Sequence, residues 1–117
     1  MYFAVGAILV MFLLAGALAF SLSRKEPETD YSAFAQCLAG KDVVMYGAAW
    51  CSHCQNQKAA FGEAFKYVKY VECPDNIPLC TDKGIQGFPT WIFPNGVTLV
   101  GEQPLAKLAA ESGCPLP

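Results

Sequence analysis

Basic residues are scarce in this chain of 117 residues, which has 8 lysines and arginines, 10 acidic residues and a formal net charge of −2. The few basic side chains are scattered along the sequence and form no cluster. A surface that follows a phosphate backbone needs concentrated positive charge. The composition therefore argues against nucleic acid as a partner.

Charge is missing altogether from Met1 to Ser23, and the stretch Phe3–Leu22 is almost entirely apolar. As a helix, about 20 residues at about 1.5 Å rise would cross a hydrocarbon core of about 30 Å. A secretory signal normally has a basic start and a shorter apolar run. We therefore expect one uncleaved N-terminal transmembrane helix within residues 1–23. The small residues Ala17 and Ala19 leave a cleaved signal as the alternative.

Two features give opposite indications of membrane orientation. Arg24 and Lys25 directly follow the apolar segment, and basic residues at this position favour the cytoplasmic side. An even, dense set of cysteines is instead typical of a disulfide-bearing domain in an oxidising compartment. We give the cysteines more weight and expect the domain on the extracytoplasmic side of a cell membrane, with a cytoplasmic domain as the alternative. The six cysteines are Cys37, Cys51, Cys54, Cys73, Cys80 and Cys114.

A polar tether over residues 24–30 leads into a single small domain over residues 31–117. Its patterning predicts the order helix, strand, helix, strand, short helix, strand, strand, helix. The clearest unit is GFPTWIFPNGVTLVG, where two strands flank the hairpin turn Asn95-Gly96. This order predicts an α/β domain with a central mixed sheet and helices on both faces. The helix that begins at Cys51 is expected to face inward with Ala59, Ala60, Phe61, Ala64 and Phe65.

The stretch AAWCSHCQNQKAAF, residues 48–61, places two cysteines three positions apart. A sulfur at a helix start lies near unpaired N–H groups and the positive end of the helix dipole, which favour the Cys51 thiolate. Cys54 follows on the same turn and can close a disulfide ring or attack a mixed disulfide. Thiol–disulfide exchange needs this combination of an exposed attacking thiol and a shielded resolving thiol. The pattern predicts a redox dithiol that requires no cofactor.

The residues beside the two cysteines suggest supporting roles. Trp50 can form a flat apolar wall next to the reactive sulfur. His53, the one histidine of the chain, can add a hydrogen bond or positive charge beside the Cys51 thiolate. A more stable thiolate makes the disulfide more oxidising. The alternative is that His53 is an exposed polar residue without a catalytic role.

The same cysteine spacing also occurs in metal sites and by chance. A zinc site generally has four ligands, often from a second CxxC or an HxxxH. With one histidine and no second cysteine pair of this spacing, the sequence leads us to expect no metal. A module that carries Cu(I) or zinc on Cys51, Cys54 and His53 is the competing hypothesis. An inactive interaction domain is a further alternative, which the intact WCSHC argues against.

WCSHC at 50–54 combined with GFPTW at 87–91 resembles the thioredoxin superfamily, and the resemblance extends over about Ser32 to Cys114. It implies a thioredoxin-like fold in which Pro89 follows a cis peptide bond and lies against the active-site disulfide. It also implies that Phe88 presents its backbone to an extended substrate. We therefore expect Trp50, Phe88 and Pro89 to bind substrate.

A finer resemblance comes from MYGAAWCSHCQNQKAAFG, YVEC, LCTDKGIQGFPTW and LAAESGC. These stretches look like the thioredoxin-like domain attached to bacterial homologues of vitamin K epoxide reductase, and the HC ending resembles the Dsb-type oxidases. The resemblance implies that the domain oxidises or isomerises cysteines of client proteins. It also implies a separate membrane partner, a quinone-linked reductase homologue, as electron acceptor. A reductant fed by a transmembrane electron carrier is the alternative.

The position of Met45 departs from the thioredoxin pattern. Thioredoxin-type enzymes often have a buried carboxylate six residues before the first active-site cysteine, where it takes the proton of the resolving thiol. With methionine there, proton handling falls to water, His53 or a backbone group.

Four cysteines lie outside the WCSHC motif, and six thiols allow 15 pairings. Cys73 and Cys80 bracket the loop PDNIPL and can form a local staple, a pairing that the resemblance supports as a structural disulfide. Cys37 and Cys114 would then join the first helix of the domain to the last. The alternative is that Cys73 and Cys80 are a second redox pair that relays electrons to Cys51 and Cys54.

Overall fold

The computed structural model describes residues 2–22 and 26–117, with side chains omitted for residues 18–22. Helix α1 spans Tyr2–Leu22, and its large apolar side chains from Tyr2 to Leu14 are exposed. Among the residues that are described, no helix is long and apolar enough to cross a membrane, so the expected transmembrane helix is not shown. Ser23, Arg24 and Lys25, where the predicted anchor meets the tether, lie outside the described residues.

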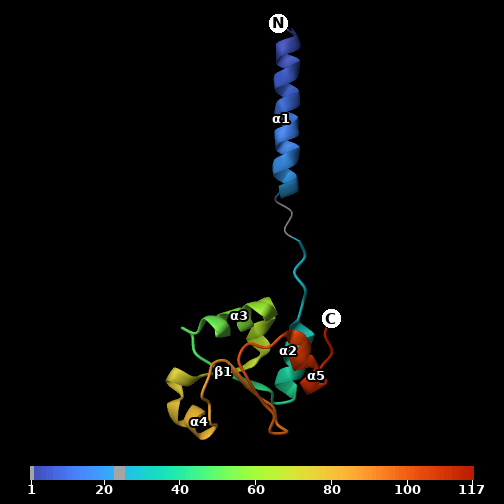
Figure 1. Cartoon of the computed structure of the whole chain (residues 1–117). Helices are drawn as coiled ribbons and strands as arrows, with labels where there is room; N and C mark the ends of the chain where they lie inside the picture. The colour runs from blue at the N-terminus through green and yellow to red at the C-terminus, as the bar shows by residue number, and fades with distance from the viewer. Residues whose placement is uncertain (1, 23–25) are drawn as a thin grey trace.

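The domain beyond residue 30 follows the predicted order of helices and strands, with two short 3₁₀ segments added (Figure 1). Its elements are α2 (Ser32–Gly40), β1 (Val44–Gly47), α3 (Ser52–Phe61), η1 (Gly62–Tyr67), β2 (Lys69–Glu72), η2 (Cys73–Asp75), α4 (Ile77–Asp82), β3 (Thr90–Ile92), β4 (Thr98–Val100) and α5 (Leu105–Ser112).

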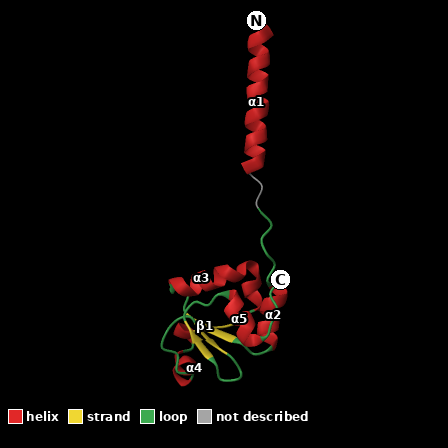
Figure 2. Cartoon of the chain, turned by 45° about the vertical axis from the view of Figure 1, so that its right-hand side comes forward, coloured by secondary structure: helices red, strands yellow, loops and turns green. Residues whose placement is uncertain are grey.

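The four strands form one sheet in the order β2-β1-β3-β4. Strand β1 pairs parallel with β2 and antiparallel with β3, and β3 pairs antiparallel with β4. Figure 2 shows the strands at the centre of the domain with helices around them. The predicted α/β domain with a central mixed sheet flanked by helices is confirmed.

Alternation along β1 divides the core into two clusters, because successive side chains of a strand point to opposite faces. Met45 packs in the larger cluster with Phe34, Phe61 and Trp91, all of them buried. Tyr46 points the other way and packs with the disulfide-forming Cys73 and Cys80. Helix α3 therefore packs on the larger cluster, and α4 packs on the smaller one.

Two disulfides close the domain at different points. Cys37 in α2 is bonded to Cys114, which follows α5, so the first and last helices of the domain are joined. Cys73 and Cys80 are bonded across η2 and the start of α4. Of the six cysteines, all of which lie in described segments, Cys51 and Cys54 are the free thiols.

The inward face of α3 differs from the expected one. Cys54, Gln57 and Phe61 are its buried residues, whereas Ala59 and Ala60 are exposed. The spacing of three and four residues places these three side chains on one helix face. The helix also ends at Gly62, whose φ of +58° suits glycine, and the chain continues as the 3₁₀ segment η1. Ala64 is buried there, as expected, and Phe65 is partly buried.

Candidate active site at the start of helix α3

Cys51 caps the N-terminus of α3. Its backbone is extended (φ −79°, ψ 120°), and its Sγ accepts a hydrogen bond from the Cys54 backbone N–H at 3.2 Å. A donor from the first turn and the positive end of the helix dipole both favour negative charge on this sulfur. The sequence placed the helix start at this cysteine, and the structure does the same.

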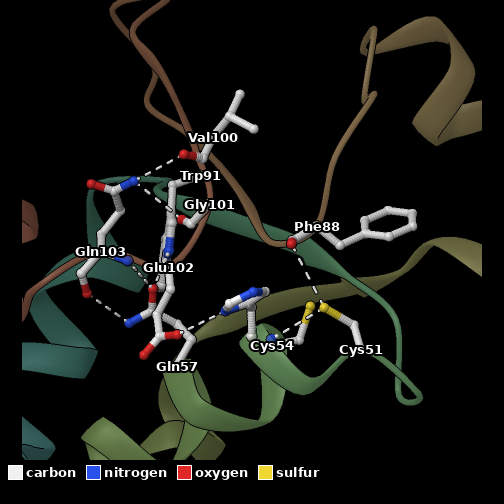
Figure 3. Close-up of polar contacts among 10 residues, drawn as sticks. Cys51, Cys54, Gln57, Phe88, Trp91, Val100, Gly101, Glu102 and Gln103 are labelled. Atoms are coloured by element: carbon white, nitrogen blue, oxygen red, sulfur yellow. Dashed lines mark hydrogen bonds and ion pairs between the residues drawn. The ribbon is translucent and has the colours of Figure 1, made fainter.

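The two sulfurs differ less in exposure than expected. Cys51 is 9% exposed and Cys54 is fully buried, so the predicted exposed attacking thiol is only slightly open to solvent. The cause is the loop before β3, since the Cys51 thiol can donate to the Phe88 carbonyl at 3.6 Å. Figure 3 shows the two sulfur atoms next to each other, with the Phe88 carbonyl directed at Cys51.

The predicted substrate-binding residues lie together beside Cys51. The Phe88–Pro89 peptide bond is cis. Trp50 is 72% exposed, and its ring meets that of Phe88 edge-on with centroids 5.9 Å apart. Phe88 also borders a pocket of about 230 Å³, which is lined besides by Cys73, Pro74, Ile77, Cys80, Thr81 and Ile85. Phe88 thus contacts the exposed Trp50 ring and also borders this mostly apolar pocket.

His53 has a neighbour that the sequence did not indicate. Its Nδ1 lies 3.3 Å from Oε2 of Glu102, in the loop between β4 and α5. The His53 side chain is 70% exposed and that of Glu102 is 39% exposed. A pair separated by 49 residues leaves no local sequence signal. The structure thus adds a carboxylate beside the histidine that we expected to act on Cys51.

Gln57 is a second residue that sequence reasoning missed. Its buried side chain accepts hydrogen bonds from the Trp91 indole N–H at 3.1 Å and the Gln103 backbone N–H at 2.7 Å. Its amide donates to the Gln103 carbonyl at 3.0 Å. The available signal was its position three residues after Cys54, on the same helix face. Gln57 links the active-site helix to the loop that carries Glu102 (Figure 3).

The Tyr70 hydroxyl and the buried Cys54 sulfur both lie next to Gly47. A Cβ atom added to Gly47 would lie 3.0 Å from the Cys54 Sγ and 3.3 Å from the Tyr70 hydroxyl, so both occupy the space that this glycine leaves open. The Tyr70 hydroxyl donates to the Glu72 carboxylate, which also accepts from the Ala49 N–H at 2.8 Å.

Burial and hydrogen bonds determine the protonation of Cys54, Tyr70 and Glu72. Burial, and after it the hydrogen bond with Cys51, raise the pKa of Cys54 to about 11. Burial and the Glu72 carboxylate likewise raise the pKa of Tyr70. Hydrogen bonds from Tyr70 and Ala49 hold the pKa of Glu72 below its usual value. At neutral pH the Cys54 thiol is therefore protonated, and the Glu72 carboxylate, which lies beyond the Tyr70 hydroxyl, is ionised.

Comparisons with known proteins agree with this geometry. The thioredoxin family model matches residues 26–111. Over 90 residues the chain is 48% identical to "Thiol-disulfide oxidoreductase LTO1" of Arabidopsis thaliana, an alignment that covers 69% of this chain and 24% of the relative. The chain thus spans about a quarter of that protein's length.

Solved thioredoxins share the fold. A thioredoxin variant from Halobacterium salinarum NRC-1 is 25% identical with a TM-score of 0.51, covering 71% of this chain and 84% of that one. Chloroplastic thioredoxin z is 18% identical with a TM-score of 0.52, covering 77% and 96%. With the family model matching most of its length, the chain belongs to the thioredoxin family.

Proposed function

We propose that this protein is a thiol–disulfide oxidoreductase whose redox couple is Cys51 and Cys54, and that it oxidises or isomerises cysteines of client proteins. The observation that carries the proposal is the position of the Cys51 Sγ. It accepts the Cys54 N–H at 3.2 Å and faces the Phe88 carbonyl beside the cis Pro89. The printed name of the Arabidopsis relative, a thiol-disulfide oxidoreductase, supports the same class of reaction.

The proposed reaction begins with the Cys51–Cys54 disulfide. A client thiolate attacks the Cys51 sulfur, the bond between the two active-site sulfurs breaks, and Cys54 leaves as a thiolate that takes up a proton. A second client thiolate then attacks the client sulfur of the mixed disulfide, and Cys51 leaves as a thiolate. The client gains a disulfide and the protein is left as the dithiol.

The client is held, in this proposal, along the edge formed by Trp50, Phe88 and Pro89. Trp50 is exposed next to the reactive sulfur, and the pocket beside Phe88 is lined mainly by apolar side chains. Apolar side chains of the client, next to its cysteine, would bury their surface against Trp50 and in this pocket. His53 remains the proposed influence on the Cys51 thiolate, with Glu102 as its partner.

Substitution of Cys51 tests the proposal. Cys51→Ser should abolish both reduction of insulin and oxidative refolding of reduced ribonuclease, whereas Ser52→Ala, at an exposed position one residue away, should keep both. Full activity of Cys51→Ser in either assay would overturn the proposal.

We further propose that the domain is tethered to a membrane and works on its extracytoplasmic side. The support is the uncharged, apolar sequence of α1 and the two disulfides of the domain. A quinone-linked membrane reductase homologue would reoxidise the dithiol. The full chain should stay with membranes in alkaline carbonate, and an external protease should reach the domain in spheroplasts. Release by carbonate would contradict the tether, and protection from protease would contradict the orientation.

A further inference from the structure

The resolving thiol needs a route for its proton. Each exchange cycle changes the protonation of Cys54, yet this residue is fully buried. The position six residues before Cys51 holds Met45, which is itself buried in the core and cannot accept a proton. A thiol with a pKa of about 11 reacts as a nucleophile only when a nearby group takes its proton.

Gly47 brings the Cys54 sulfur and the Tyr70 hydroxyl to the same place. A methyl group at this glycine would contact both the sulfur, at 3.0 Å, and the hydroxyl oxygen, at 3.3 Å. The pairing of β1 with β2 produces this arrangement, since Met45 lies opposite Tyr70 and Gly47 lies opposite Glu72. Gly47 carries no side chain, so the Cys54 sulfur and the Tyr70 hydroxyl both border the space where one would lie.

The Tyr70 hydroxyl continues to the surface through Glu72. It donates to the Glu72 carboxylate, which the Ala49 N–H holds in place at 2.8 Å. Glu72 is only partly buried, so its carboxylate can exchange protons with water. A hydroxyl both donates and accepts, and can therefore pass a proton between a thiol and a carboxylate.

We propose that Tyr70 and Glu72 form the proton path of Cys54, in place of the carboxylate that is missing at Met45. The inference deepens the proposed function, because it rests on exchange at Cys51 and Cys54. When Cys54 attacks a mixed disulfide, its proton passes to the Tyr70 oxygen while the Tyr70 proton moves to Glu72. The new Cys51–Cys54 bond forms, the client sulfur leaves as a thiolate, and Glu72 releases its proton to water.

The reverse reaction uses the same groups. When a client thiolate breaks the Cys51–Cys54 disulfide, a proton from water reaches Glu72, the Tyr70 hydroxyl proton moves to the departing Cys54 thiolate, and Tyr70 recovers a proton from Glu72. The other titratable groups that face this path, Cys51 and Lys58, come from the N-cap and the last turn of α3. Cys51 contacts Cys54, and the Lys58 ammonium lies 4.1 Å from the centre of the Tyr70 ring. Lys58 lowers the pKa of both Cys54 and Glu72.

The test measures the resolution step in the reduced full chain. Reaction with 5,5′-dithiobis(2-nitrobenzoate) releases one thionitrobenzoate when Cys51 attacks and a second when Cys54 resolves the mixed disulfide. We expect Tyr70→Phe and Glu72→Gln each to slow the second release by about a hundredfold, the lower end of general acid–base effects. The double variant should be no slower than the slower single variant, because both residues serve one path.

Three readouts separate a proton path from a merely structural role. The second release should become more steeply dependent on pH in both variants, and small buffer bases such as imidazole should restore part of the rate in Glu72→Gln. Tyr67→Phe, a tyrosine outside this group, should match the wild type. Glu72→Gln keeps the size of the side chain and one acceptor oxygen for the Ala49 N–H, and its NH2 can donate to the Tyr70 oxygen. This variant therefore decides the question if Tyr70→Phe does not fold.

Wild-type rates in both variants, or slowing without a change in the pH profile and without buffer rescue, would overturn the proton path. Exchange that persists in Cys51→Ser would instead overturn the proposed function. The first release depends on Cys51 alone, and the second depends also on the proton path. Failure of the proposed function therefore appears in Cys51→Ser, and failure of the proton path appears in the second release of Tyr70→Phe and Glu72→Gln.

Discussion

The side chain of Gln57 binds the backbone of Gln103 with both ends of its amide. Its Oε1 accepts from the Gln103 N–H at 2.7 Å, and its Nε2 donates to the Gln103 carbonyl at 3.0 Å. The same Oε1 accepts from the Trp91 indole at 3.1 Å. One buried side chain of α3 thus holds the β4–α5 loop, in which Glu102, the residue before Gln103, lies beside His53.

Removal of this amide should destabilise the fold. Gln57→Leu leaves the Trp91 N–H and both backbone groups of Gln103 without their partner, and we expect a loss of about 2–4 kcal/mol in the free energy of unfolding. Urea denaturation measures it. Asn56→Ala, at the neighbouring exposed position, is the control and should change stability by less than about 0.5 kcal/mol. Equal stability of the two variants would contradict this role of Gln57.

Substitution of the resolving cysteine should trap a client. In Cys54→Ser the mixed disulfide on Cys51 has no internal thiol to break it, so covalent adducts with cysteine-containing proteins should accumulate. Non-reducing electrophoresis followed by peptide mass mapping should place the linkage on Cys51. Adducts located on Cys73 or Cys80 would show instead that the second pair takes part in electron transfer.

The stability of the reduced protein should depend on pH through Cys54. Its pKa in the folded protein is about 11, above its ordinary value of 9.0, mainly because burial disfavours the thiolate. A raised pKa stabilises the folded state below about pH 9, and this contribution is lost as the pH rises from about 9 towards 11. The Cys51–Cys54 disulfide form has no such thiol.

We therefore expect the melting temperature of the dithiol form to fall more steeply over this range than that of the disulfide form. Differential scanning fluorimetry of the two forms, side by side, removes the effects of lysines and tyrosines that both share. Parallel curves between pH 9 and 11 would show that the Cys54 thiol is not protected in the folded state.

The disulfide between α2 and the C-terminal segment should contribute more stability than the local one. For a sequence separation of 77 residues, chain entropy suggests about 4.5 kcal/mol for Cys37–Cys114, before strain is counted. A separation of 7 residues suggests about 2.5 kcal/mol for Cys73–Cys80. Paired serine substitutions at each disulfide, compared by urea denaturation, should show this order. The reverse order would show that loop entropy does not dominate.

Local patterns sufficed for much of the fold. The Asn95-Gly96 turn lies between β3 and β4, and the cysteine pair begins α3, because each depends on neighbouring residues alone. The inward face of α3 could not be predicted from hydrophobicity, since its middle member is the polar Gln57 and the exposed alanines carry no strong preference.

Contacts across the sheet and between loops could not be predicted from the sequence. The register of β1 against β2, which brings Gly47 opposite Glu72, depends on the packing of the whole sheet. The meeting of His53 and Glu102 depends on the β4–α5 loop. The resemblance indicated that a carboxylate was missing at Met45. The position of Tyr70 near Cys54, with Glu72 as the partner of Tyr70, depends on the strand pairing.

The most direct test of the account is the reduction potential of Cys51 and Cys54 in the full chain, equilibrated in glutathione buffers and followed by mass mapping of these two cysteines. A client oxidase or isomerase predicts a two-electron transition between about −120 and −180 mV. A value near about −270 mV, as in thioredoxin, would contradict the oxidising role and make the protein a reductant.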